Sequence, residues 1–454
     1  MKETIRHRKV LVLSYMISPF RGSEYSVGWN YVTHMSVDHE LVVLYGAAGE
    51  HLGDVEELEN YLAEHPMPNV RFIAVRPSGL ANWLNGLNRR GIFTYSFYLA
   101  YALWHRQVYR VALELTRREE FDLIHYLNPI GYREPGYLWK IDLPYLWGPV
   151  GGVSNYPRAL WPALPAAAKW KFGLLRSLIN NWQLRHNRRV ANALKHTDLL
   201  LTATTENQNK FRSIHGKESV YMPENCIVTD DAASPVFPLS SGSAGPGLSA
   251  AGTSSLHGVA PSAPGVAMIP LRFVWIGRID AGKALIILLE ALAAMPDRSG
   301  FVVDIIGDGP LRPSLQDYAQ SKGITNLVWH GRVDRTRVDE LLSVASLHLI
   351  TSLSEGNPTT IWEAMSKGVP TLSLDHCGMH DVLCDDCGIR IPVESYTQVV
   401  ETLATTLQEL VAEPGRLATL STGTRACARR YSWAARREQL TELYTQTIEA
   451  WISR

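Results

Sequence analysis

The chain has 454 residues, more than a single hydrophobic core usually organises, so two domains are expected. Apolar residues make up 46% and charged residues 19%, which is ordinary for a soluble globular protein. The 44 basic residues balance 44 acidic ones, so the net charge does not indicate a nucleic-acid partner. Five cysteines, an odd number, do not make a disulfide framework, and the cytoplasm is the expected compartment.

Short apolar runs alternate with longer amphipathic segments through the first half of the chain. The first run ends at Ser18, too soon for the apolar stretch of a signal peptide, and the segment 91–104 is too short to span a bilayer. Runs of this kind are typical of a parallel sheet buried on both faces. Residues 1–233 are therefore expected to form a Rossmann-like domain, with strands at 10–15, 40–45, 70–75, 123–126, 145–147 and 199–203.

Two glycine-containing loops follow strands of this half. The loop 18–28 contains Gly22, which would allow a ligand to approach the backbone closely. The loop lacks the G-x-G-x-x-G spacing of dinucleotide-binding proteins, so the sequence gives little support to a dehydrogenase function. The glycine cluster at 147–152 suits a tight turn and a ligand contact equally.

The stretch 143–197 contains no Asp or Glu but eight Lys and Arg residues, with several aromatic residues among them. A basic, aromatic, amphipathic helix suits an anionic membrane surface or a lipid-diphosphate acceptor, so 158–195 is a candidate for peripheral binding to the inner face of the membrane. A helix packed on the core with a solvated basic face fits the pattern equally. No nucleic-acid recognition motif accompanies the basic residues. The apolar positions that share one helical stripe are Leu175, Leu178, Ile179 and Trp182.

Residues 234–270 are dense in Ser, Gly, Ala and Pro and contain no charged residue, which predicts a flexible linker and a hinge for closing a cleft. The alternating pattern then returns, so a second Rossmann-like domain is expected over 271–431. The helical segment 432–454 is able to pack on either domain, including a return to the first. The strands expected in the second domain are 272–276, 302–306, 327–330, 347–351 and 371–374, with helices at 285–294 and 335–344.

The segment 352–370 combines a strand end, a loop and a helix. Asn357 and Pro358 are expected to be the N-cap and the first helical residue, and Gly368 ends the helix. The start of such a helix presents N–H groups and a positive dipole end to anionic oxygen. Glu355 lies just before that end and Glu363 eight residues later, so two carboxylates flank a predicted anion site.

The spacing Glu355-x7-Glu363 resembles the paired-glutamate motif of glycosyltransferase family 4, the group 1 glycosyltransferases, which are retaining enzymes of the GT-B fold. The segment 273–283 resembles that family's strand-Gly-Arg-loop-Lys segment, in which Arg278 and Lys283 would hold the donor diphosphate; Ala284 stands where the family usually has Gly. The turn 305–310 resembles its Gly-rich turn beside the nucleotide. The resemblance is close over residues 270–395.

This resemblance implies an α/β protein of two Rossmann-like domains that face each other across a cleft. It also implies an enzyme that transfers a hexosyl unit from a nucleotide sugar to a glycan or lipid-linked acceptor. The expected role is in surface polysaccharide or glycolipid synthesis. No cofactor and no metal are implied. Glu355 would contact the sugar ring and Glu363 the ribose. The other residues placed on the donor side are Gly22, Gly277, Gly307, Gly309, Gly356, Asn357, Pro358 and Thr359.

The acceptor side depends on fewer residues. His125 lies where many members carry a cleft histidine, but Leu127 stands where many have a second one, so His125 is either catalytic or a buried structural residue. Arg133 and Glu134 are the nearest polar groups expected to face an acceptor.

Two other functions share these features: a nucleotide-sugar epimerase of the same fold, and a non-catalytic module that binds sugar nucleotides or membranes. A metal site is not expected in the cluster of His and Cys residues at 376–387. Cys384 and Cys387 have zinc-knuckle spacing, but no second pair of ligands follows at the usual distance.

Overall fold

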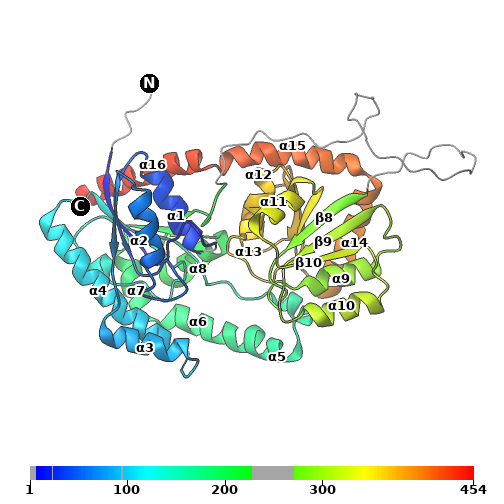
Figure 1. Cartoon of the computed structure of the whole chain (residues 1–454), viewed down its shortest axis with the longest axis horizontal. Helices are drawn as coiled ribbons and strands as arrows, with labels where there is room; N and C mark the ends of the chain where they lie inside the picture. The colour runs from blue at the N-terminus through cyan, green and yellow to red at the C-terminus, as the bar shows by residue number, and fades with distance from the viewer. Residues whose placement is uncertain (1–6, 23, 94–95, 228–269) are drawn as a thin grey trace, which may run out of the picture.

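The computed structural model describes residues 7–22, 24–93, 96–227 and 270–454, which form two α/β domains along the long axis of the molecule (Figure 1). The predicted linker lies outside these residues except for Pro270.

The N-terminal domain contains a parallel seven-stranded sheet with the order β3-β2-β1-β4-β5-β6-β7. The predicted apolar runs form the first six strands, and β7, only two residues long, was not predicted. The strands are β1 (Lys9–Ser14), β2 (Glu40–Tyr45), β3 (Val70–Ala74), β4 (Leu123–Asn128), β5 (Tyr145–Val150), β6 (Leu199–Thr202) and β7 (Val220–Tyr221). The main helices are α1 (Glu24–Met35), α2 (Glu56–Glu64), α3 (Gly79–Arg89), α4 (Ser96–Arg118), α6 (Arg176–His186), α7 (Arg188–His196) and α8 (Thr205–His215).

The C-terminal domain has a parallel six-stranded sheet with the order β10-β9-β8-β11-β12-β13. Its strands are β8 (Leu271–Ile276), β9 (Phe301–Ile306), β10 (Leu327–Gly331), β11 (Leu347–Ile350), β12 (Thr371–Leu374) and β13 (Gly388–Ile391). Its helices are α9 (Leu285–Ala294), α10 (Arg312–Ser321), α11 (Arg335–Ser343), α12 (Thr359–Ser366), α13 (Cys377–Val382), α14 (Tyr396–Ala412) and α15 (Pro414–Arg430).

Strand order reverses between β1 and β4 in the first sheet and between β8 and β11 in the second. Open α/β sheets bind ligands outside the carboxyl ends of the strands at such switch points. The loops after β1, β8 and β11 carry Gly22, Lys283 and Glu355 in turn. The topology therefore brings the predicted donor-side loops to the switch points of the two sheets.

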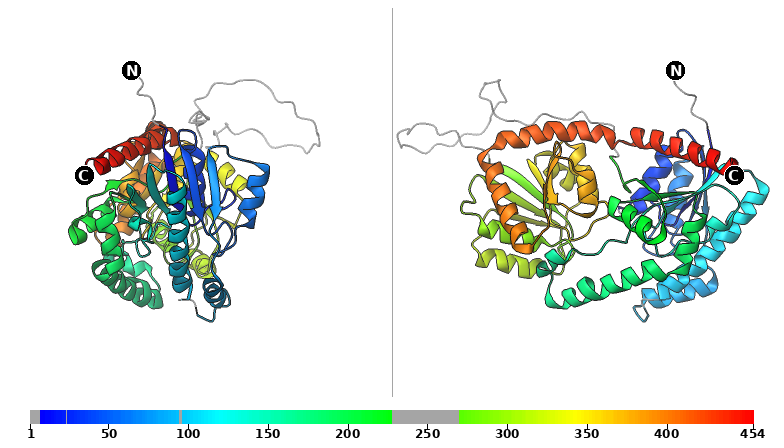
Figure 2. Two further views of the ribbon diagram at one scale, coloured as in Figure 1. Left: turned by 90° about the vertical axis from the view of Figure 1, so that its left-hand side faces the viewer. Right: turned by 180° about the vertical axis from the view of Figure 1, so that it is seen from behind.

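The final helix, α16 (Trp433–Ile452), packs on the N-terminal domain, which is one of the two positions that the sequence allowed. Helices α15 and α16 run along the same side of the molecule and together span both domains (Figures 1 and 2). Trp433, Leu440 and Tyr444 are buried in the N-terminal core. At the crossing, the Ile227 N–H donates to the Tyr431 carbonyl over 2.8 Å, so the two passages of the chain between domains are hydrogen-bonded to each other.

Of the two roles considered for His125, catalytic or structural, the structure supports the structural one, because the side chain is buried. The prediction that it is a catalytic group is wrong. Its Nδ1 lies 2.8 Å from the Tyr444 hydroxyl and 3.1 Å from the Tyr31 hydroxyl, and its Nε2 lies 2.8 Å from the Gly148 carbonyl oxygen. Burial lowers the pKa of His125 to about 4. The side chain connects β4 to α1 and α16 and does not face the cleft.

The predicted apolar stripe, which begins at Leu175 just before α6 and continues along that helix, does not pack on the core. Leu175, Leu178, Ile179 and Trp182 are all exposed, whereas Asn180 of the same helix is buried and donates to the Val153 carbonyl over 2.9 Å. The helix packs on the core through a different face, with Asn180 and Leu184 buried, so only the predicted stripe is free of the core. Among the described residues, no helix is long and apolar enough to cross a membrane.

Candidate active site

Two glycine-rich turns of the C-terminal domain pack backbone against backbone. Gly307 has a φ of 132°, and a Cβ on it would lie 1.9 Å from the Gly277 carbonyl oxygen. A Cβ on Gly309 would lie 2.3 Å from the Ile279 carbonyl oxygen. These glycines are required because the two loops touch, and their contact shapes the loop that leads to Lys283.

Ala284, the departure from the family pattern, has a left-handed backbone with φ 45° and ψ 44°. A side chain at such a position costs roughly 1–2 kcal/mol, which glycine avoids. The structure thus supplies the physical reason why glycine is usual there.

Lys283 and Glu355 form an ion pair at the carboxyl ends of β8 and β11. The pair lies beside the start of α12, where Pro358 is the N-cap and no side chain caps the helix. The prediction that Asn357 is the N-cap is wrong. Its Oδ1 accepts a hydrogen bond from Trp362 Nε1 over 2.5 Å, and its Nδ2 donates to the Asn225 carbonyl of the other domain.

A pocket of about 210 Å³ lies at this point, between the two domains. The C-terminal domain contributes the ion pair and the start of α12, and the N-terminal domain contributes α1 and the chain after β7. The lining residues are Glu24, Val27, Glu224, Asn225, Lys283, Glu355, Asn357, Pro358, Thr359 and Thr360.

Three other donor-side residues lie elsewhere. Arg278 is exposed, with its Nε 3.6 Å from Asp280 Oδ2. Glu363 is paired with Arg335 of α11 over 2.9 Å, and burial raises its pKa. Gly22 is exposed in the loop before α1, and no described atom lies within 4 Å of the position of a Cβ on it.

Sequence reasoning did not single out Glu24 and Glu224, which face the Lys283–Glu355 pair from the N-terminal domain. Burial raises the pKa of Glu24 to about 7, and one of its oxygens has no hydrogen-bond partner among the described residues. Burial, with the nearby Glu24 and Glu355 carboxylates, raises the pKa of Glu224 to about 8. The two lie far apart in sequence, and only their burial in the fold distinguishes them from other glutamates.

A second pocket, of about 540 Å³, lies in the N-terminal domain and shares Glu24 with the first. Arg133 and Glu134, the residues predicted to face an acceptor, are among its lining residues. Asn180 and Gln183 of α6 accept hydrogen bonds from Arg133, and Arg189 of α7 pairs with Glu134 over 3.0 Å. Its aromatic lining consists of Tyr15, Tyr25, Phe97, Tyr98 and Tyr101.

The raised pKa of Glu224 predicts a pH-dependent stability. Its folded-state pKa of about 8 lies above the ordinary value, so the folded protein binds the proton more tightly and loses stability as the pH rises toward 8. We expect Glu224→Gln to raise Tm at pH 8 and to flatten the fall in Tm between pH 5 and 8.5, measured by scanning fluorimetry. The exposed Glu442→Gln is the control. An unchanged pH profile in Glu224→Gln would contradict the assignment.

Residues 266–417 match the family model described as glycosyl transferases group 1. A D-inositol 3-phosphate glycosyltransferase of Xylanimonas cellulosilytica is 27% identical over 178 residues, which cover 38% of this chain and 42% of that protein. The chain therefore matches less than half of the length of that relative.

Two solved structures match the whole chain. Sucrose-phosphate synthase from Thermosynechococcus elongatus superposes with a TM-score of 0.60 at 13% identity, over 98% of this chain and 100% of that one. Anabaena HepE in complex with UDP-glucose superposes with a TM-score of 0.57 at 15% identity, over 97% and 100%. The two facing α/β domains thus have the GT-B fold, and the C-terminal one carries a domain of the group 1 glycosyltransferases.

Proposed function

We propose that the chain is a retaining glycosyltransferase that moves a hexosyl unit from a nucleoside-diphosphate sugar to a hydroxyl of a glycan or lipid-linked acceptor in surface polysaccharide or glycolipid synthesis. The observation that carries this proposal is the interdomain pocket, which combines the Lys283–Glu355 pair with the uncapped start of α12. The UDP-glucose complex of the HepE neighbour and the named activity of the Xylanimonas relative support it.

The donor diphosphate would lie between Lys283 and the first N–H groups of α12, where a cation and a helix dipole favour negative charge. Lys283 would exchange its partner Glu355 for phosphate oxygens, which frees the Glu355 carboxylate to accept from sugar hydroxyls. Glu363 would accept from the ribose, and the exposed Arg278 side chain is free of the core and able to turn toward the diphosphate.

In the transfer step the bond from the anomeric carbon to the phosphate oxygen breaks, and the acceptor oxygen bonds to that carbon on the same face. The acceptor hydroxyl passes its proton to the departing phosphate. Lys283 and the N–H groups of α12 stabilise the charge that grows on the leaving group. We expect this step to need no metal ion, because the cation and the helix end supply that stabilisation.

The acceptor would bind in the N-terminal pocket. Its aromatic side chains offer faces on which sugar rings stack, and Glu24, Glu50 and Glu134 offer oxygens that accept from hydroxyls. Glu24 lines both pockets, so it marks the point where the acceptor hydroxyl would meet the donor.

We further propose that an anionic membrane surface carries the lipid-linked acceptor. Helices α3 and α6 lie along the same edge of the molecule (Figures 1 and 2). The exposed large side chains on this edge include Leu80 and Trp83 of α3 and Leu178, Ile179 and Trp182 of α6. Apolar groups beside basic ones, with no acidic residue between 143 and 197, complement an anionic bilayer.

The same edge leads to the proposed acceptor pocket. Helices α3 and α4 contribute Asn85, Asn88 and Tyr101 to that pocket, while Trp83 and Leu99 of these helices are exposed. A lipid-linked sugar at the membrane surface would therefore have a short path into the N-terminal domain.

The proposal is tested by incubating the protein with a panel of sugar nucleotides and measuring release of nucleoside diphosphate. We expect release with one donor, and a fall of about 100-fold in Glu355→Ala, because Glu355 orients the sugar. The product should keep the anomeric configuration of the donor by NMR. An isomerised sugar nucleotide would indicate an epimerase, and binding without turnover a non-catalytic module.

A further inference from the structure

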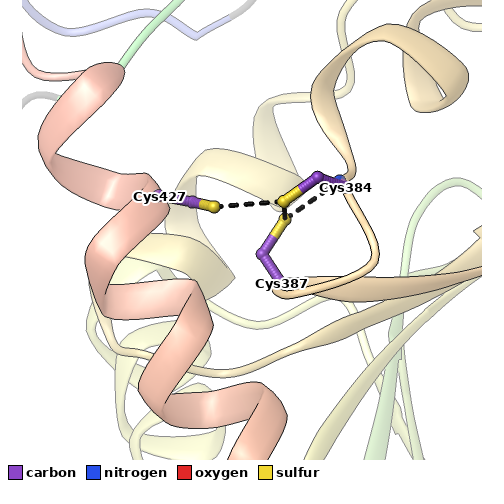
Figure 3. A group of neighbouring side chains, drawn as sticks. All are labelled: Cys384, Cys387 and Cys427. Atoms are coloured by element: carbon purple, nitrogen blue, oxygen red, sulfur yellow. Dashed lines mark hydrogen bonds between the residues drawn. The ribbon is translucent and has the colours of Figure 1, made fainter.

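Three cysteines of the C-terminal domain meet away from both pockets (Figure 3). Cys384 and Cys387 lie in the loop between α13 and β13, and Cys427 reaches them from α15. The Cys384 Sγ lies 3.3 Å from the Cys387 Sγ and 3.2 Å from the Cys427 Sγ. Because Cys427 comes 40 residues after Cys387, the spacing of the first pair alone does not reveal it.

The histidines and the cysteine that precede this pair in sequence lie elsewhere. His376, Cys377 and His380 line a pocket between α8 and α13, together with Glu206. The sequence cluster at 376–387 thus divides in two, and the three-cysteine group gains its third member from another helix.

One backbone N–H of the cluster points to sulfur. The Cys384 N–H donates to the Cys387 Sγ over 3.2 Å.

The sulfur spacing suits a metal ion better than a disulfide. Tetrahedral zinc with Zn–S bonds near 2.3 Å separates its sulfurs by roughly 3.8 Å, which the cluster reaches by opening about half an ångström. A disulfide of about 2.0 Å requires two sulfurs to approach by more than 1 Å and leaves the third cysteine unused.

We propose that Cys384, Cys387 and Cys427 bind one thiophilic metal ion, represented by Zn²⁺, through three thiolates and a water molecule. Each thiol releases its proton to solvent on binding. Three thiolates and Zn²⁺ carry a net charge of −1. Cys384 is only partly buried, so water reaches the fourth position.

Such a site would tie α15 to the loop before β13. Helix α15 leads directly into α16, so the metal would hold the segment that connects the two domains. This role is structural and independent of the proposed transfer, because none of the three cysteines lines the interdomain pocket.

The test uses the full chain, stripped of metal and kept reduced without thiols, and titrated with Zn²⁺ against a chromophoric chelator. We expect one equivalent to bind, and Co²⁺ to give thiolate-to-metal charge-transfer absorption. Cys384→Ser and Cys427→Ser should each weaken binding by roughly 100-fold or more, while the matched variant of the buried Cys226, Cys226→Ser, should bind as the parent chain does.

A second readout on the unmutated chain guards against variants that fail to fold. Bound Zn²⁺ should protect Cys384, Cys387 and Cys427 from alkylation, as read by mass spectrometry of the peptides. Binding below one equivalent, binding that survives in both serine variants, or a Cys384–Cys387 disulfide in zinc-saturated protein would overturn the proposal.

Discussion

Replacing Lys283 with alanine lowers kcat for nucleoside diphosphate release by about 100- to 1,000-fold, the usual effect of removing one group that stabilises a developing anion. Lys283 is the cation that lines the interdomain pocket, and it lies beside the uncapped start of α12. Its loss leaves Glu355 unpaired next to the site of the diphosphate, so repulsion adds to the lost attraction. Steady-state kinetics with the donor identified in the panel measure the effect.

Lys283→Arg retains the charge with altered geometry and should keep part of the activity. The control is Lys367→Ala at the far end of α12, where the lysine pairs with Asp339 over 3.6 Å outside the pocket. It should turn over at the parent rate. Equal kcat in Lys283→Ala and the parent chain would refute the diphosphate assignment.

Replacing two exposed tryptophans together with glutamate, Trp170 in the helical segment just before α6 and Trp182 of α6, abolishes sedimentation with anionic vesicles. The two residues are 63% and 65% exposed, so the change removes apolar contact with lipid without opening the core. Burying a large apolar side chain contributes about 1.5–3 kcal/mol, so two of them account for about 100-fold or more in partitioning. The new charges also repel anionic lipid.

The matched control is Val328→Glu with Val344→Glu, since both valines are exposed on the C-terminal domain. This variant should sediment with vesicles as the parent chain does, and both variants should release nucleoside diphosphate normally in the absence of membranes. Undiminished vesicle binding by the tryptophan variant would contradict the membrane proposal.

The strands were largely predictable because each is a short apolar run that its own sheet buries. The two-residue β7 gives no such signal. The docking of α16 was not predictable, because the stripe of Leu440, Tyr444 and Ile448 suits any apolar surface, and only the tertiary fold brings it against His125 and α1.

The candidate site was likewise predictable only in part. Lys283, Glu355 and the start of α12 could be predicted because each follows a strand within one local pattern. Glu24 and Glu224 could not, because their raised pKa values arise from burial between two domains. Asn357 fits the pattern of a cap, but Trp362 and the other domain supply better partners for its amide.

The return of α16 also affects the order of folding during synthesis. Domains usually fold in the order in which they leave the ribosome. Here the N-terminal core contains Trp433, Leu440 and Tyr444, so that domain cannot complete its packing until these residues have emerged. The last element of the C-terminal domain is α15, which ends at Arg430, so all elements of that domain have been synthesised before α16. The domain synthesised second is thus the first able to finish folding, and the nascent N-terminal domain must keep the groove for α16 open until then.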